Sequence, residues 1–206
     1  YFRANSWYTA PGNDAPSKGS SFLQTKVSSS IAHLYNRPRT WLEAFHSMGW
    51  GSSGEWLTQQ IDHHFMAGGN LVCMHGLYYS THGGWWEWAP PCNHFRMPYW
   101  ETMDKNLEIT ERLSYLFSQG YHQCDVGILY PVEPKVSGYK NISSDVAFKA
   151  GEKLYGNGVD FDYIDYSSLC NSVVDNGELK ISGESYKAIN IMRKIKADET
   201  TSAFLK

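Results

Sequence analysis

The sequence predicts an α/β protein of parallel strands and helical crossovers, followed by a second α/β unit. The first observation is the order of elements over residues 21–119, which is helix, strand, helix, strand, long loop and helix. Such alternation favours parallel strands joined by helices. The second observation is an apolar strand over residues 125–130, which opens a further set of short elements. We therefore divide the chain into residues 1–122 and a partial α/β accessory domain of residues 123–206.

The first predicted elements precede residue 46. Residues 1–20 hold many turn-forming residues without periodicity, so we expect a loop there. Residues 21–35 place apolar side chains at near-helical spacing and predict a helix. Pro38 prevents that helix from continuing, and residues 39–45 predict a short strand.

A second helix and a second strand follow. Ser52 and Glu55 have the spacing of a capping box. They predict a helix over residues 54–66, which two glycines end. Residues 70–74 are mainly apolar and predict a buried strand, in which Cys73 is a small buried side chain.

The longest predicted helix covers residues 99–119 and ends at Gly120. We expect four of its apolar residues to face the core, namely Met103, Leu107, Leu113 and Leu116. After the strand at residues 125–130 we expect a loop, a helix and two strands, over residues 131–142, 145–155, 160–165 and 178–181.

Residues 75–100 form a predicted loop with an unusual composition, including Gly-Gly, Pro-Pro and three tryptophans within six positions. Ligands bind at the carboxyl edge of parallel strands, where this loop starts. Flat, amphipathic rings also suit the faces of sugars, so the loop predicts a carbohydrate site. Trp85, Trp86 and Trp88 would stack on the sugar, and Glu87 would accept a hydrogen bond from a hydroxyl. Alternatively, these rings form a small core of the loop itself and Glu87 is solvated.

Glu43 is the predicted catalytic residue. It lies near the end of its strand, before a glycine-containing loop, where a carboxylate can act as a general base or acid. Alternatively, it caps the loop or pairs with Arg39. His75 has the matching place on the next strand, where it binds a hydroxyl or serves a structural role. Further substrate-binding candidates nearby are His46, His94 and Trp100.

Several functional classes lack support in the sequence. The net charge of −3, without a basic run, argues against nucleic acid as the partner. No apolar run approaches the roughly 18 residues that cross a membrane. Nucleotide-binding and serine-hydrolase motifs are absent, and no zinc ligand spacing is present. The four cysteines do not fix the compartment.

Three stretches together resemble a known family. They are residues 26–45, 64–79 and 99–131, which hold a Ser-x-Ala-His-Leu-Tyr helix, a strand ending Glu-Ala-Phe, and a Gly-Asn strand ending in His. A Trp-containing helix ending Gln-Gly then precedes an Asp-Val strand. This order resembles the C-terminal part of the catalytic barrel of glycoside hydrolase family 106, the α-L-rhamnosidases.

The resemblance implies the C-terminal portion of a (β/α)8 barrel, followed by part of a flavodoxin-like or amidotransferase-like α/β domain. It makes Glu43 the base that activates water in an inverting mechanism, with the general acid on an earlier strand. It also implies calcium near the sugar as a possible cofactor. The expected partners are a carbohydrate substrate and the remainder of the parent polypeptide, or a sister subunit, which would complete the barrel. For a bacterial protein, a periplasmic or secreted location is favoured.

Two positions depart from the family pattern. His46 stands where the family has Thr, and a Gly-Gly-Trp-Trp-Glu-Trp run replaces its usual Pro-Gly pattern. These changes bear on the preference for rhamnose more than on the hydrolase class. Two alternatives stay open, namely a non-catalytic carbohydrate-binding or remnant protein and a galactosidase-like barrel enzyme.

Overall fold

The computed structural model describes residues 2–15, 22–80, 82–83, 93–131 and 144–191. The protein is α/β, as the sequence predicts, and its strands form three sheets of three strands each within the described residues. Two of these sheets are parallel and the third is antiparallel.

The first parallel sheet has the order β1-β2-β3, with β1 at Gly12–Ala15, β2 at Trp41–Ala44 and β3 at Leu71–Met74. Each strand follows the previous one through a helical crossover, as expected for parallel pairing. The helices of this part are α1 at Phe2–Asn5, α2 at Phe22–Leu34, α3 at Gly54–Met66, η2 at Trp100–Thr102 and α4 at Met103–Leu116.

The second parallel sheet has the order β5-β4-β9 and belongs to the C-terminal half. Beside it lies the antiparallel sheet β6-β7-β8. The strands are β4 at Val126–Leu129, β5 at Phe161–Ile164, β6 at Val173–Asp175, β7 at Glu178–Ile181, β8 at Glu184–Tyr186 and β9 at Ala188–Asn190. The helices are α6 at Ser144–Tyr155 and α7 at Tyr166–Cys170.

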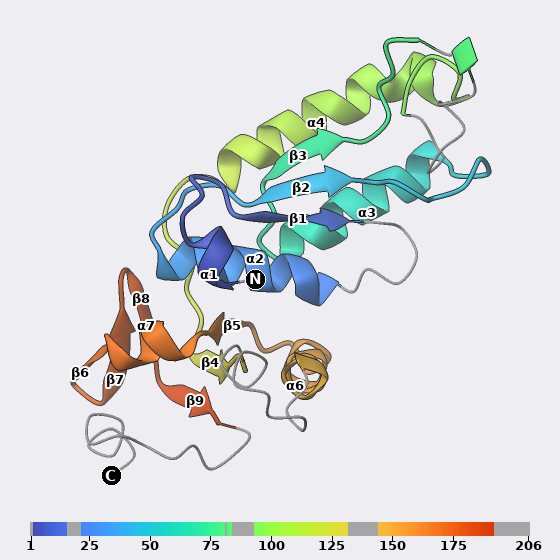
Figure 1. Cartoon of the computed structure of the whole chain (residues 1–206). Helices are drawn as coiled ribbons and strands as arrows, with labels where there is room; N and C mark the ends of the chain where they lie inside the picture. The colour runs from blue at the N-terminus through green and yellow to red at the C-terminus, as the bar shows by residue number, and fades with distance from the viewer. Residues whose placement is uncertain (1, 16–21, 81, 84–92, 132–143, 192–206) are drawn as a thin grey trace.

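Helix α2 lies between the two parallel sheets (Figure 1). Its apolar side chains, such as Leu23, Val27 and Ile31, share one core with Ile128 and Tyr163 of the second sheet. The opposite side of α2 packs on β1 and α3. A helix covered on both sides must also bury its polar residues, and Thr25, Lys26, Ser28, Ser29 and Ser30 are all buried.

The end of α3 must pass close to α2. Gly68 has a positive φ of 91°, which glycine adopts without strain. A Cβ at this position would lie 2.5 Å from the Cβ of Ser29. The hydroxyl of Ser29 donates to the carbonyl of Ala67 at 2.7 Å. The two glycines that end the predicted helix therefore also permit this close packing.

The N-terminal loop predicted over residues 1–20 is wrong in part. The structure has helix α1 there and strand β1, whose four residues pair in register with Trp41–Ala44 of β2. The sequence Gly-Asn-Asp-Ala has low strand propensity. Pairing with β2 and packing on α2 therefore determine the conformation of this segment, which its local sequence does not predict.

The strand at residues 70–74 forms, but the prediction that it is buried is wrong. Leu71 and Cys73 are exposed, and Val72 and Met74 are half-buried. Residues on a strand alternate between faces, and the described helices pack on one face of this sheet. Cys73 therefore lies on the uncovered face rather than in the core.

Two helix details also differ from the predictions. The side chain that caps α3 is Ser53, which accepts a hydrogen bond from the Trp56 amide at 3.1 Å, and not Ser52. Helix α4 ends at Leu116, before residue 119. Met103 is buried and Leu113 packs against the core, but Leu107 and Leu116 are 45% and 62% exposed. Elements β6, β8, β9 and α7 were not anticipated.

The described strands β1, β2 and β3 form an open sheet, and no barrel closes within the described residues. The division near residue 122 stays a prediction. None of the helices described in the structure has the length and apolar character needed to cross a membrane.

We predict that Ser30→Ala weakens the junction between α2 and the second sheet. The Ser30 hydroxyl accepts a hydrogen bond from the Tyr163 amide at 2.9 Å and donates to the Lys26 carbonyl at 2.6 Å. The variant leaves the Tyr163 N–H buried without this partner, which costs about 1–3 kcal/mol. Urea unfolding should show this loss. The exposed Ser167→Ala control should change the free energy by less than about 0.5 kcal/mol, and an equal effect of both variants would contradict the assignment.

We also predict that stability falls as the pH drops from about 6.5 to 4. Burial, together with the nearby charge of His63, lowers the pKa of His64 from 6.5 to about 4. Between these two pH values His64 is protonated in the unfolded chain but neutral in the folded protein. Lowering the pH therefore favours the unfolded state. The full effect is about 3 kcal/mol, measurable as the unfolding free energy at pH 7 and pH 4.

The variant His64→Gln should lose most of this pH dependence, and the exposed His82→Gln control should keep it. The contribution of Asp160 to stability changes only at a lower pH than that of His64. Although burial opposes it, hydrogen bonds from His122 and Lys26 lower the pKa of Asp160 to about 2. An unchanged slope between pH 6.5 and 4 in His64→Gln would contradict this account.

Candidate functional site

The structure brings Glu43 and His75 together at the carboxyl edge of the first sheet. Glu43 lies on β2, and His75 directly follows β3, where its amide donates to the Ala44 carbonyl. His75 Nδ1 lies 3.2 Å from Glu43 Oε1. The Glu43 side chain is 34% exposed and that of His75 is 18% exposed. The carboxylate is therefore held by an imidazole and still open to water.

Arg39 is not the partner of Glu43 in the described contacts. Its guanidinium Nη1 donates to the Asn70 carbonyl at 3.2 Å and to the Ser114 carbonyl at 2.8 Å. The alternative in which Glu43 only neutralises Arg39 therefore loses its basis.

The segment after the aromatic loop closes onto His75. Asn93 Nδ2 donates to the His75 carbonyl at 2.8 Å, and the Tyr99 hydroxyl donates to Asn93 Oδ1 at 2.7 Å. The Tyr78 hydroxyl lies 3.5 Å from His75 Nε2. These contacts fix the position of the imidazole.

The other predicted substrate-binding residues lie at different depths. His46 is half-buried, and its ring centre lies 5.7 Å from that of His75. Trp100 is 39% exposed at the start of η2. His94 is fully buried and stacks on Phe95 at 4.7 Å between ring centres. Trp85, Trp86, Glu87 and Trp88 lie outside the described residues.

Asp14 is a candidate site residue that the sequence did not predict. The register pairs Asp14 of β1 with Glu43 of β2, and Glu43 with Cys73 of β3. Partner residues in a sheet project from the same face, about 4.8 Å apart along the hydrogen-bonding direction. Two carboxylates therefore stand side by side, and Asp14 is exposed. Its segment was expected to be a loop, so only the pairing of β1 reveals this position.

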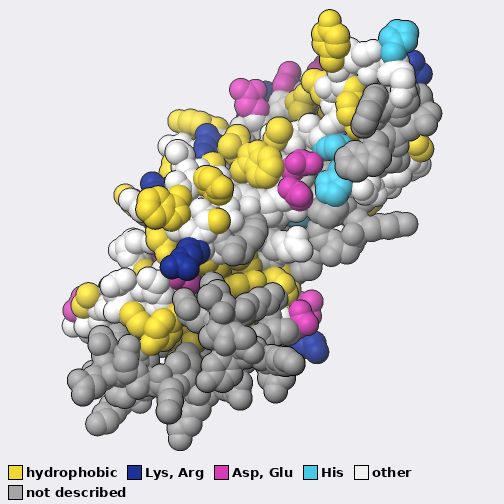
Figure 2. All heavy atoms as spheres, viewed as in Figure 1, with side chains coloured by type: hydrophobic (Ala, Val, Ile, Leu, Met, Phe, Trp, Pro, Cys, Tyr) yellow, Lys and Arg dark blue, Asp and Glu magenta, His cyan; other side chains and the backbone are white. Residues whose placement is uncertain are grey.

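The face that carries Glu43 is the one that the described helices leave uncovered. The opposite face holds buried Ala15, Ala44 and half-buried Met74, which pack into the core with α3. On the Glu43 face, Leu71 is 37% exposed. Figure 2 shows acidic and histidine side chains gathered among hydrophobic ones over this part of the molecule. In a (β/α)8 barrel the helices cover the outside and the other face lines the interior.

A calcium site does not fit the described residues near Glu43. Calcium takes six to eight oxygen ligands, and this edge supplies the carboxylates of Asp14 and Glu43. The described groups of three potential metal ligands lie elsewhere in the protein.

A cavity of about 980 Å³ lies away from this edge. It is lined by α2, by the residues after α4, and by residues near Asp160 and Glu184. The Glu43 site is instead an open sheet face.

No model of a known protein family matches the sequence, and no curated protein sequence matches it. Among solved structures, the chain is similar to a rhamnosidase from Novosphingobium sp. PP1Y, with a TM-score of 0.66 and 17% sequence identity. The similarity covers 91% of this chain and 19% of the rhamnosidase. At this identity it supports a rhamnosidase-like fold.

Proposed function

We propose that this chain is part of a glycoside hydrolase that cleaves α-L-rhamnosides by inversion, with Glu43 as the general base. The observation that carries the proposal is the Glu43–His75 pair, 3.2 Å apart at the carboxyl edge of parallel strands. The fold similarity to a rhamnosidase supports the hydrolase class. The family resemblance of the sequence supports the inverting route.

Glu43 would take a proton from the water that attacks the anomeric carbon. Its half-exposed carboxylate can reach such a water. His75 acts as a positioning residue. When its Nδ1–H donates to Glu43 Oε1, its Nε2 faces the Tyr78 hydroxyl at 3.5 Å. One Glu43 oxygen is then held, and the other is free to accept the proton.

The general acid is expected on a strand outside this chain's described sheet. Inverting enzymes hold their two carboxyl groups about 6.5–9.5 Å apart, so that water fits between base and sugar. Asp14 lies on the adjacent strand, at the shorter spacing of paired strands. We therefore assign Asp14 to the sugar hydroxyls, whose hydrogen bonds its exposed carboxylate can accept.

The uncovered face supports a barrel interior completed by further strands. The chain spans 19% of the length of the similar rhamnosidase. Exposed Leu71 and Cys73 lie beside Glu43 on this face, where interior side chains of a barrel would pack. The remainder of the parent polypeptide or a sister subunit would supply the missing strands and the acid. The aromatic loop, including Trp100, would then set sugar preference.

A non-catalytic sugar-binding protein is the second candidate. The short spacing between Asp14 and Glu43 favours it, because this pair suits hydroxyl binding more than inversion. A galactosidase-like enzyme is the remaining alternative within the hydrolase class. Hydrolysis of an aryl α-L-rhamnoside but not of an aryl galactoside would distinguish the proposed rhamnosidase from the galactosidase-like enzyme.

We predict that Glu43→Gln in the full-length gene product lowers kcat for an aryl α-L-rhamnoside by about 10²–10⁴, because general base catalysis is lost. KM and rhamnose binding, followed by calorimetry, should change little. Glu108→Gln on α4, where the carboxylate is 66% exposed, is the matched control. An unchanged kcat in Glu43→Gln would contradict the assignment of Glu43 as the general base. Sugar binding without hydrolysis in the parent protein would favour the non-catalytic candidate.

We predict that Asp14→Asn mainly raises KM. The amide keeps the shape of the side chain but accepts hydrogen bonds from sugar hydroxyls less strongly than the carboxylate does. We expect KM to rise about tenfold, which corresponds to the loss of one charged hydrogen bond of about 1.4 kcal/mol. A fall in kcat as large as that of Glu43→Gln, with KM unchanged, would instead make Asp14 the acid.

A further inference from the structure

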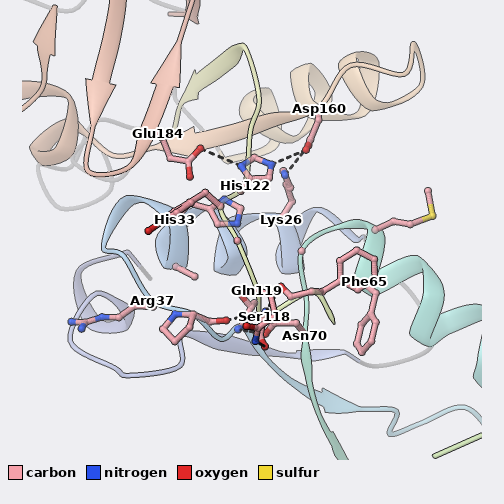
Figure 3. A pocket seen from close by; sticks show the side chains of 18 of the residues that line it. Lys26, His33, Arg37, Phe65, Asn70, Ser118, Gln119, His122, Asp160 and Glu184 are labelled. Carbon is pink, nitrogen blue, oxygen red and sulfur yellow. Dashed lines mark hydrogen bonds and ion pairs between the residues drawn. The ribbon is translucent and has the colours of Figure 1, made fainter. Parts of the chain in front are cut away.

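A second cluster of reactive side chains lies where α2 meets the second parallel sheet. It combines residues that are distant in the sequence, namely His33 of α2, His122 and Cys124 before β4, Asp162 of β5 and Glu184 of β8. Figure 3 shows His33, His122 and Glu184 pointing toward one another at one end of the cavity, beside Lys26 and Asp160.

His122 is the centre of this cluster. Its Nε2 lies 2.8 Å from Asp160 Oδ2. Its Nδ1 points to the other side, 3.3 Å from Asp162 Oδ2 and 3.4 Å from Glu184 Oε2. Cys124 Sγ lies 3.7 Å from the same Asp162 oxygen. The ligand atoms of His122, Cys124 and Asp162 therefore all lie within 4.8 Å of one another, and Glu184 belongs to an adjoining group with His122 and His33.

Two of these atoms are buried without a hydrogen bond. Glu184 is 5% exposed, and neither its Oε2 nor His122 Nδ1 has a hydrogen-bond partner within the described part of the chain. A charge-assisted hydrogen bond would be about 2.7–2.9 Å long, which is shorter than their separation of 3.4 Å. Buried polar atoms rarely stay unpaired, so these two indicate a missing ligand between them.

The separations fit two ligands of one tetrahedral metal ion. Bonds of about 2.0–2.1 Å at the tetrahedral angle place N and O ligands about 3.4 Å apart. A sulfur ligand at about 2.3 Å lies about 3.6 Å from an oxygen ligand of the same ion. The distances from His122 Nδ1 to the carboxylates, and from Cys124 Sγ to Asp162, have these values.

The charges around the cluster also favour a cation. Asp160 and Asp162 share Lys26, whose Nζ lies 2.7 Å from Asp160 and 4.0 Å from Asp162, whereas Glu184 is described in an ion pair with the His122 imidazole only. Lys26 therefore pairs mainly with Asp160, and the three carboxylates outnumber the one lysine among their described partners. Buried carboxylates need a compensating charge.

We propose that His122, Cys124 and Asp162 bind a divalent transition-metal ion of the zinc class, with Glu184, 3.4 Å from His122 Nδ1, as the carboxylate nearest to a fourth position. Mixed nitrogen, sulfur and oxygen ligands favour zinc over calcium or magnesium. The site ties the segment before β4 to β5 and β8, so its role is structural. It is separate from the proposed hydrolase site at Glu43.

The surrounding residues fit such a site. The Tyr186 hydroxyl donates to Asp162 Oδ2 at 3.0 Å, and His33 Nδ1 lies 2.9 Å from Asp162 Oδ1. The His33 ring stacks on that of His122, with 4.0 Å between centres. Contacts of this kind orient metal ligands. No ligand spacing in the sequence predicts this site, because the fold alone assembles it.

The test uses the full 206-residue chain, freed of metal and titrated with zinc and with cobalt(II). Calorimetry should give one zinc per chain. Cobalt should give visible bands of tetrahedral geometry and a near-ultraviolet thiolate-to-cobalt band. In Cys124→Ser the thiolate band should vanish and zinc affinity should fall at least tenfold, whereas Cys73→Ser on exposed β3 should behave as the parent chain.

His122→Ala should abolish zinc binding, with His82→Ala as its control. If His122→Ala does not fold, the conservative Cys124→Ser experiment still decides. Absence of stoichiometric zinc binding would overturn the proposal, as would a thiolate band that survives Cys124→Ser. None of these readouts uses hydrolysis, so their failure leaves the proposal for Glu43 untouched.

Discussion

The burial of a polar helix between two sheets is the constraint on which the rest of the structure depends. Helix α2 carries Lys26, Ser29 and Ser30, which are all buried. A buried polar group without a partner costs about 1–3 kcal/mol, and a buried charge costs more. Each of these residues has a partner at a defined place, as in the ion pair of 2.7 Å between Lys26 and Asp160. Helix α2 therefore has one favourable position against the second sheet.

The same packing determines where the candidate active site can be. Because α2 and α3 cover one face of β1–β3, the alternate residues Asp14, Glu43 and Cys73 share the other face. The order of strands then places His75 beside Glu43 at the carboxyl edge. The proposed chemistry thus follows from which face the helices leave open.

The sequence predicts those parts of the molecule that depend on local patterns. The apolar spacing of α2, the capped start of α3 and the apolar run of β4 each identify an element close to its observed bounds. The adjacency of Glu43 and His75 follows from two parallel strands that end at one edge.

Features that depend on contacts between residues distant in the sequence could not be predicted from it. Strand β1 has weak local propensity and forms by pairing with β2, so Asp14 could not be placed. Burial of β3 was overestimated, because an apolar run does not tell which face is covered. The cluster around His122 joins residues of four separate segments, and only the fold brings them together.

Helix α2 is the junction that joins the two parallel sheets in one core, so the two sheets should unfold together. All eight tryptophans lie at or before Trp100, so their fluorescence during urea unfolding reports the first sheet. Amide exchange of β4 and β5 at the same urea concentrations reports the second sheet. Coincident transitions are predicted, and two separate midpoints would contradict a shared core.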